Sequence, residues 1–157
     1  MKESNNDLLK ILVIEDDNSR IKYFDLWLLP GFRIVPTTSA GTALGLIQRD
    51  KGFVYAGICL DHDLQGQTKT AKDCDLSGTT VVKNIIRYMD KRIPILVHSM
   101  NPTRAPIMAN TLKTSGFKDV LRISMADLTK TLFQEWLIEV RENWTDEQED
   151  ECDFSFT

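Results

Sequence analysis

Two clusters of acidic residues supply carboxylates suited to metal chemistry, and each follows an apolar run. Glu15 and Asp16 end the run KILVIED, and Asp61 ends the run YAGICLD. On neighbouring strands these three carboxylates would meet, and close carboxylates repel unless protonated or bridged by a cation. An all-oxygen ligand set favours Mg²⁺, with Mn²⁺ as an alternative. The acids could instead simply cap the following helices, a role that we expect for Asp17.

The two histidines of the chain stand beside such clusters. His62 directly follows Asp61, and His98 precedes Ser99 at the end of another apolar run, PILVHS. Imidazole titrates near neutral pH, so the pair could remove and deliver the protons of phosphodiester hydrolysis. We therefore predict acid–base roles for both rings and no direct contact with the metal. The alternative is that each ring is structural, because successive side chains of a strand point to opposite faces.

The elements that must position these residues are five β-rich runs alternating with helical patterns. Nearly continuous apolar runs are typical of parallel strands covered on both faces. The expected strands are 10–16, 32–37, 55–61, 94–99 and 119–124, and the expected helices are 18–29, 39–49, 79–90, 102–115 and 128–144. This alternation predicts an α/β three-layer sandwich with a five-stranded parallel sheet, whose ligands bind beyond the carboxyl ends of the strands.

Composition limits the class of protein. A chain of 157 residues is most simply one domain, which we place at residues 1–145, followed by an acidic tail at 146–157. The tail is either solvated or docks a partner through Phe154 and Phe156. No apolar run approaches the roughly 20 residues of a membrane span, and the start, interrupted by Lys10, lacks a secretory signal, so we expect a cytoplasmic protein without a membrane partner.

Charge and cysteine content exclude two further classes of site. The formal net charge of −4 predicts no general nucleic-acid-binding patch, because phosphate neutralisation needs clustered lysines and arginines. Three cysteines, an odd number without a C-x-x-C spacing, argue against a disulfide framework and a structural zinc site.

The motifs KILVIEDD, ICLDHDL and PILVHSMN resemble the receiver domains of two-component response regulators, over about residues 8–143. The resemblance implies a flavodoxin-like sheet in the order 2-1-3-4-5. It also implies that Asp61 accepts a phosphoryl group whose oxygens contact Ser99. The Mg²⁺ ligands that it implies are Glu15, Asp16, Asp61 and the main-chain carbonyl of Asp63.

Three features depart from receivers, and one of them is the pair of histidines, His62 and His98, beside the positions that handle the phosphoryl group. Receivers carry a lysine at the end of the fifth strand, where this chain reads VLRISMADL, with Arg122 and Lys118 as the nearest cations. Without that lysine a phospho-aspartate loses a charge-assisted hydrogen bond of about 1.5–3 kcal/mol, so we expect no long-lived phosphorylation. The segment between Asp61 and Gly78 is also long, and its Lys69 and Lys72 either meet an anionic ligand or belong to a solvated loop.

The pair LDHDL and HSMNP, with this longer loop, is similar to the receiver group that is predicted to process cyclic phosphates. The resemblance implies a Mg²⁺-dependent hydrolase acting on a cyclic phosphate of a nucleotide or RNA end. Asn101 would then orient the substrate, or it simply caps the helix expected from Pro102. Two alternatives remain: an atypical receiver or pseudo-receiver that acts through a protein partner, and a phosphate-sensing module without turnover.

Overall fold

A computed structural model of the chain describes residues 8–64 and 78–155. Five strands form one sheet in the order β2-β1-β3-β4-β5, and every neighbouring pair is parallel, which confirms the predicted architecture. The three central strands are short and buried along their length, apart from the first residues of β1. The strands are β1 (Leu9–Ile14), β2 (Phe32–Thr37), β3 (Gly57–Leu60), β4 (Ile95–Val97) and β5 (Val120–Arg122).

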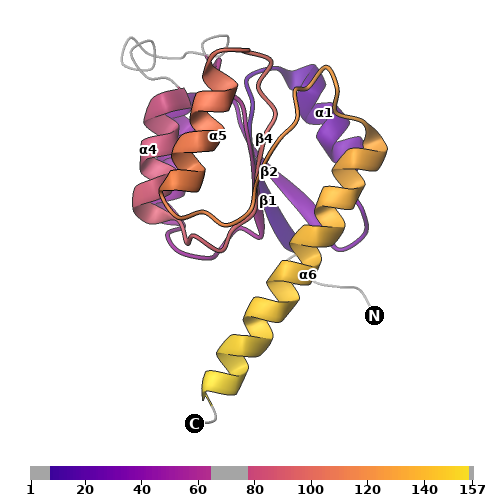
Figure 1. The fold of residues 1–157 in the computed structure, drawn as a ribbon. Coiled ribbons are helices and arrows are strands. Elements are labelled where there is room, and N and C mark those ends of the chain that lie inside the picture. Colours follow the sequence, from indigo (N-terminus) through magenta and orange to yellow (C-terminus); the bar gives the residue numbers. More distant parts are fainter. Residues whose placement is uncertain (1–7, 65–77, 156–157) are drawn as a thin grey trace.

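Helices cover both faces of the sheet (Figure 1). In the described residues they are α1 (Asn18–Leu26), α2 (Ala40–Arg49), α4 (Gly78–Tyr88), α5 (Arg104–Thr114) and α6 (Lys130–Ser155). Side chains of α2, α4 and α5 pack in one apolar cluster, and those of α1 and α6 pack in a second cluster on the opposite face. Alternate residues of the central strands supply these two clusters, as the period of two in a strand requires.

Helix ends follow local hydrogen bonding. The Asp17 carboxylate accepts hydrogen bonds from the amides of Ser19 (2.8 Å) and Arg20 (3.2 Å), which confirms the predicted cap. Helix α1 ends at Leu26, earlier than the predicted residue 29, and the residue before Pro30 is biased away from helical dihedrals. Gly116, with φ of +108°, stands just beyond the end of α5, as expected of a helix stop.

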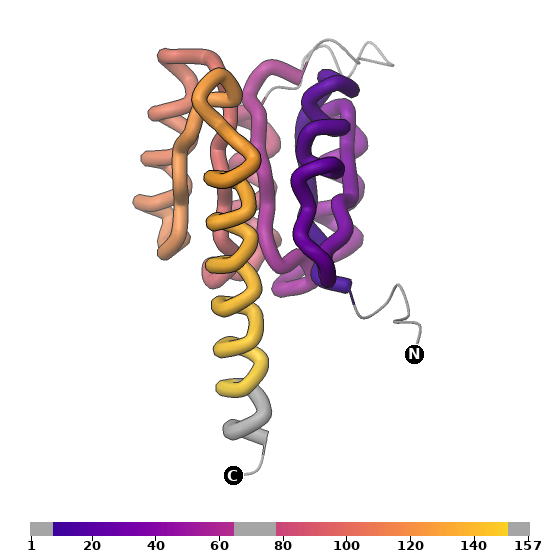
Figure 2. The backbone as a smooth tube through the Cα atoms, turned by 90° about the vertical axis from the view of Figure 1, so that its right-hand side faces the viewer, coloured from indigo at the N-terminus to yellow at the C-terminus, as the bar shows by residue number. Residues whose placement is uncertain are grey.

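Helix α6 is longer than predicted. We expected it to end at Trp144, and it continues to Ser155 through the acidic run. Figure 2 shows the helix extending beyond the end of the sheet. No glycine or proline interrupts residues 130–155, and glutamates are good helix formers. Arg92, at the base of the domain, binds Glu147 at 3.0 Å. The predicted docking role of Phe154 and Phe156 falls on side chains outside the described residues.

None of the helices in residues 8–64 and 78–155 combines the length and the apolar character needed to cross a lipid bilayer.

Candidate functional site

Three polar side chains meet where the central strands end. Glu15, Asp61 and His98 directly follow β1, β3 and β4. The parallel ladder continues into these residues, because the Asp61 amide donates to the Ile14 carbonyl and the His98 amide donates to the Leu60 carbonyl, both at 3.0 Å. The residues two positions earlier face the α1/α6 side of the sheet: Val13, Cys59 and Leu96. The period of two therefore directs all three polar side chains to that same side.

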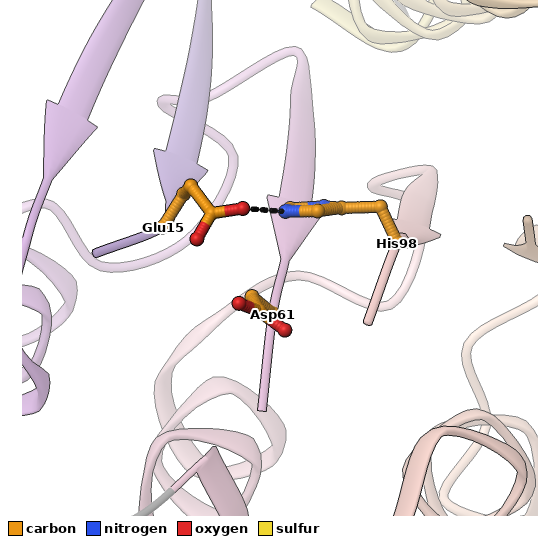
Figure 3. Close-up of side chains that lie close together, drawn as sticks. All are labelled: Glu15, Asp61 and His98. Atoms are coloured by element: carbon orange, nitrogen blue, oxygen red, sulfur yellow. Dashed lines mark hydrogen bonds and ion pairs between the residues drawn. The ribbon is translucent and has the colours of Figure 1, made fainter. Parts of the chain in front are cut away.

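Figure 3 shows how closely these side chains converge. One ligand atom from each of Glu15, Asp61 and His98 lies within 4.8 Å of the others. His98 Nε2 is 3.3 Å from Glu15 Oε1. Glu15 and His98 are fully buried, and Asp61 is 2% exposed. Burying two carboxylates side by side is costly unless protons or a cation compensate their charge.

The electrostatics of this cluster follow from its burial. Burial, reinforced by the neighbouring Glu15 carboxylate, raises the pKa of Asp61 to about 6. Burial also raises the pKa of Glu15, although the hydrogen bond to Asp61 partly opposes that effect. Burial lowers the pKa of His98 to about 4, against the attraction of Asp61, so this ring is neutral at pH 7. The cluster thus offers two carboxyl groups and a neutral imidazole, a donor set that fits a divalent cation.

Arg20 also lies beside these carboxylates, a position that the sequence patterns did not predict. Its Nη1 atom lies 3.5 Å from Glu15 Oε1 and 3.7 Å from Asp61 Oδ2. Its position could have indicated a role, because Arg20 stands in the first turn of α1, where the helix dipole disfavours a cation. Arg122, which we considered as the substitute for the receiver lysine, is exposed at the end of the edge strand β5. Within the described residues, the cation that lies beside Asp61 therefore comes from α1.

The other expected metal ligands line an open cleft in front of the cluster. This cleft has a volume of about 480 Å³, and its walls are Asp16, Asp17, Arg20, Asp61, Asp63, Met100, Asn101 and Pro102. Asp61 thus belongs to both the buried cluster and the cleft, whereas Asp16 and Asp63 belong to the cleft. Metal contact is not predicted from the sequence for either histidine, but the His98 ring lies close enough to Glu15 and Asp61 to share an ion with them.

His62 points elsewhere. Its ring Nδ1 lies 2.9 Å from Asp63 Oδ1, and its Nε2 lies 3.5 Å from the Thr79 hydroxyl at the start of α4. It is absent from the lining of the cleft, and its amide instead donates to Asp61 Oδ1 at 2.8 Å. The predicted acid–base role of this ring stays a prediction.

Ser99 and Asn101 organise the turn after β4. Ser99 is buried, and its Oγ accepts a hydrogen bond from the Asn101 amide at 3.1 Å. Asn101 Oδ1 accepts from the amides of Thr103 (3.1 Å) and Arg104 (2.8 Å), so the side chain caps α5, which begins at Arg104 and not at Pro102. Asn101 also lines the cleft, where its amide nitrogen is a possible donor to a substrate. The predicted ligands Lys69 and Lys72 lie outside the described residues.

Comparison with protein families gives a match over residues 11–114 to the family described as "Cyclic-phosphate processing Receiver domain". A comparison with curated proteins finds no match.

Solved structures share the fold at low sequence identity. A protein described as an adenylate cyclase from Rhodopirellula baltica superposes with a TM-score of 0.67 and 16% identity, over 96% of this chain and 99% of that chain. A response regulator receiver domain from Clostridium thermocellum gives 0.63 and 15%, over 90% and 98%. The receiver domain of a sensor histidine kinase from Pseudomonas aeruginosa, which holds a magnesium ion in its active site cleft, gives 0.58 and 19%, over 83% and 94%.

Proposed function

This chain belongs to the cyclic-phosphate processing receiver domain family, and we propose that it is a divalent-metal-dependent hydrolase of cyclic phosphates on nucleotides or RNA ends. The observation that carries the proposal is the buried convergence of Glu15, Asp61 and His98 within 4.8 Å. Two carboxylates in such a site are poorly compensated by Arg20 alone, which lies at 3.5–3.7 Å. A bound cation relieves that repulsion.

The residues present fit such a cation. Glu15, Asp61 and His98 would hold it from the protein side, with Asp16 and the main-chain carbonyl of Asp63 as further oxygen donors at the cleft. When bound, a divalent cation supplies charge stabilisation for phosphate oxygens and lowers the pKa of water. Mg²⁺ and Mn²⁺ are the expected ions.

Arg20 is the group that we assign to the phosphate. A guanidinium presents several N–H donors in a plane and remains charged at any working pH. Arg20 lines the cleft at the point where Asp61 opens into it. The Asn101 amide nitrogen, from the opposite wall, is the second assigned donor to the phosphate.

Proton transfer is assigned to the pair formed by His62 and Asp63. Asp63 is exposed and lines the cleft, and His62 Nδ1 lies 2.9 Å from its carboxylate. The Asp63 carboxylate would accept a proton removed at the cleft. The His62 ring would hold that carboxylate in position. His98 has a fully buried side chain and is a positioning residue or metal ligand in this scheme, because a substrate in the cleft does not reach it.

A phospho-accepting receiver is the second candidate, and one observation favours it. Arg20 Nη1 lies 3.7 Å from Asp61 Oδ2, where a cation can partner a phosphoryl group. Both candidate functions use Asp61, so a measurement of turnover decides between them.

The test is a hydrolysis assay with nucleoside 2′,3′-cyclic and 3′,5′-cyclic phosphates and an RNA ending in a 2′,3′-cyclic phosphate, each with Mg²⁺ or Mn²⁺. Phosphorus NMR monitors the reaction. We expect the wild type to open at least one of the cyclic esters. Asp61→Asn should lose this activity, and Asp119→Asn should retain it. Asp119 is a partly buried aspartate just before β5, remote from the cleft. Unchanged esters in every arm would refute the hydrolase.

A further inference from the structure

We propose that an apolar cleft beside the metal cleft binds the base of a nucleotide substrate, an inference that deepens the proposed function and rests on it. This second cleft has a volume of about 390 Å³. Its walls are Arg20, Tyr23, Trp27, Met100, Met125, Ala126 and Leu128. The volume lies at the small end of the roughly 300–1,000 Å³ that small-molecule sites occupy.

The two clefts are neighbours because they share two lining residues. Arg20 and Met100 belong to both walls, and the remaining walls differ in character: acidic and polar on one side, aromatic and thioether on the other. A nucleotide has the same division, with an anionic phosphate at one end and a flat apolar base at the other. Phosphate beside Arg20 and Asp61 places the base over the apolar cleft.

Tyr23 and Trp27 form an aromatic shelf. Their ring centroids are 5.5 Å apart with an interplanar angle of 30°. Trp27 is partly buried and also packs against Phe24 and Phe133, with centroids at 6.5 and 6.2 Å, so its ring is held in place. Tyr23 is 51% exposed. Stacking on such rings tolerates every base, because every base has a π-face.

Met100 and Met125 also line this cleft. Met100 is 47% exposed although it sits directly beside a polar cleft. Thioether side chains are polarisable and adapt to the outline of an aromatic ligand. Among the lining residues within 8–64 and 78–155, Arg20 alone has a charged or amide side chain. These residues do not supply the paired donors and acceptors that read a base edge, and we expect little discrimination among the four bases.

A protein partner is the competing occupant of this surface, since Leu26 on the same helix is 75% exposed. Two observations favour the base. The cleft is continuous with the metal cleft through Arg20, and Leu26 does not line it. Leu26 therefore serves as the matched control: an exposed apolar residue of α1, outside the shelf.

The experiment measures binding without turnover. Tryptophan fluorescence and calorimetry report the affinity of AMP and CMP against ribose 5-phosphate and inorganic phosphate, each with Mg²⁺. We expect the nucleotides to bind more tightly than ribose 5-phosphate. Tyr23→Ala should weaken nucleotide binding by about 5- to 150-fold, the range typical of one lost stacking partner. Inorganic phosphate affinity should not change.

Tyr23→Phe, which keeps the ring, should bind the nucleotides as the wild type does, and so should Leu26→Ala. Equal affinities for AMP and ribose 5-phosphate, or equal losses in Tyr23→Ala and Leu26→Ala, would overturn the base site. A failed hydrolysis assay with Tyr23-dependent AMP binding would refute only the proposed reaction. Hydrolysis that is indifferent to Tyr23 would refute only the base site.

Discussion

The Nε2 atom of His98 lies 3.3 Å from Oε1 of Glu15, and both side chains are sealed from solvent. A neutral imidazole in this place brings a nitrogen donor to a site that the sequence had presented as all-oxygen. The ring is also fixed by an edge contact with Phe24, at a centroid distance of 4.9 Å. In the proposed metal site, the Glu15–His98 contact therefore bears on which ion would bind.

The first prediction concerns this selection. Nitrogen ligands favour Mn²⁺ and later transition metals over Mg²⁺, so His98→Gln should weaken Mn²⁺ binding by roughly tenfold or more and Mg²⁺ binding much less. Thermal unfolding with each metal measures the change in metal affinity. A ligand at a hundredfold excess over its dissociation constant stabilises the folded state by about 2.7 kcal/mol. His62→Gln, at the other histidine, should respond like the wild type. Equal Mn²⁺ responses in all three proteins would exclude His98 as a ligand.

The second prediction is a pH dependence of stability in the metal-free protein. Burial and Glu15 raise the pKa of Asp61 from 3.8 to about 6, so the folded state holds this proton more tightly, and the contribution of Asp61 is lost as pH rises from 4 to 6. Burial lowers the pKa of His98 from 6.5 to about 4, so its contribution is lost as pH falls through the same window. Each group changes the free energy of unfolding by about 3 kcal/mol across this pH range, and the two changes have opposite signs.

Single substitutions should separate these trends. Relative to the wild type, His98→Gln should lose about 3 kcal/mol of stability on going from pH 4 to pH 6, because the Asp61 trend remains. Asp61→Asn should change in the opposite direction. Urea unfolding at pH 4, 5 and 6 with a chelator provides the measurement. Parallel pH profiles in all three proteins would show that the two groups titrate normally.

The third prediction is that acetyl phosphate leaves no long-lived adduct on Asp61. Arg122 is exposed on β5, and Arg20 is shared with the Glu15 carboxylate. Among the described residues, a phosphoryl group on Asp61 would therefore have to share Arg20 with Glu15. Intact-mass measurement over minutes to hours tests this. A stoichiometric adduct that disappears in both Asp61→Asn and Arg20→Gln would establish the receiver alternative.

The fourth prediction assigns a catalytic cost to His62. If the His62–Asp63 pair transfers protons, His62→Ala should lower turnover by roughly 10²–10⁴-fold and leave the metal-induced shift in melting temperature unchanged. The rate assay is the one described for cyclic phosphates. Thr79→Ala, which removes only the 3.5 Å contact to the same ring, is the control and should cost little. A His62→Ala enzyme with full turnover would make this ring structural.

The fold and the location of the site were predictable from sequence because parallel strands bring their carboxyl ends to one edge. Glu15, Asp61 and His98 follow buried runs, and their convergence needs only that topology. Which ring faces the cluster was not predictable, since it depends on the residue at which each strand ends, and one position of slip reverses the side-chain direction. The position of Arg20 beside the cluster was also not predictable. It depends on how α1 crosses the sheet, which local sequence patterns do not specify.

His62, just after β3, and Gly78, at the start of α4, are joined by a close backbone contact. The Gly78 amide donates to the His62 carbonyl at 3.2 Å, and a Cβ at Gly78 would stand 2.6 Å from His62 Cα, so the two backbones touch only because residue 78 has no side chain. The segment between them thus begins and ends at one point of the scaffold. Closing a longer loop costs little additional entropy. An insertion made between these two residues should therefore leave the sheet and its buried cluster as they are.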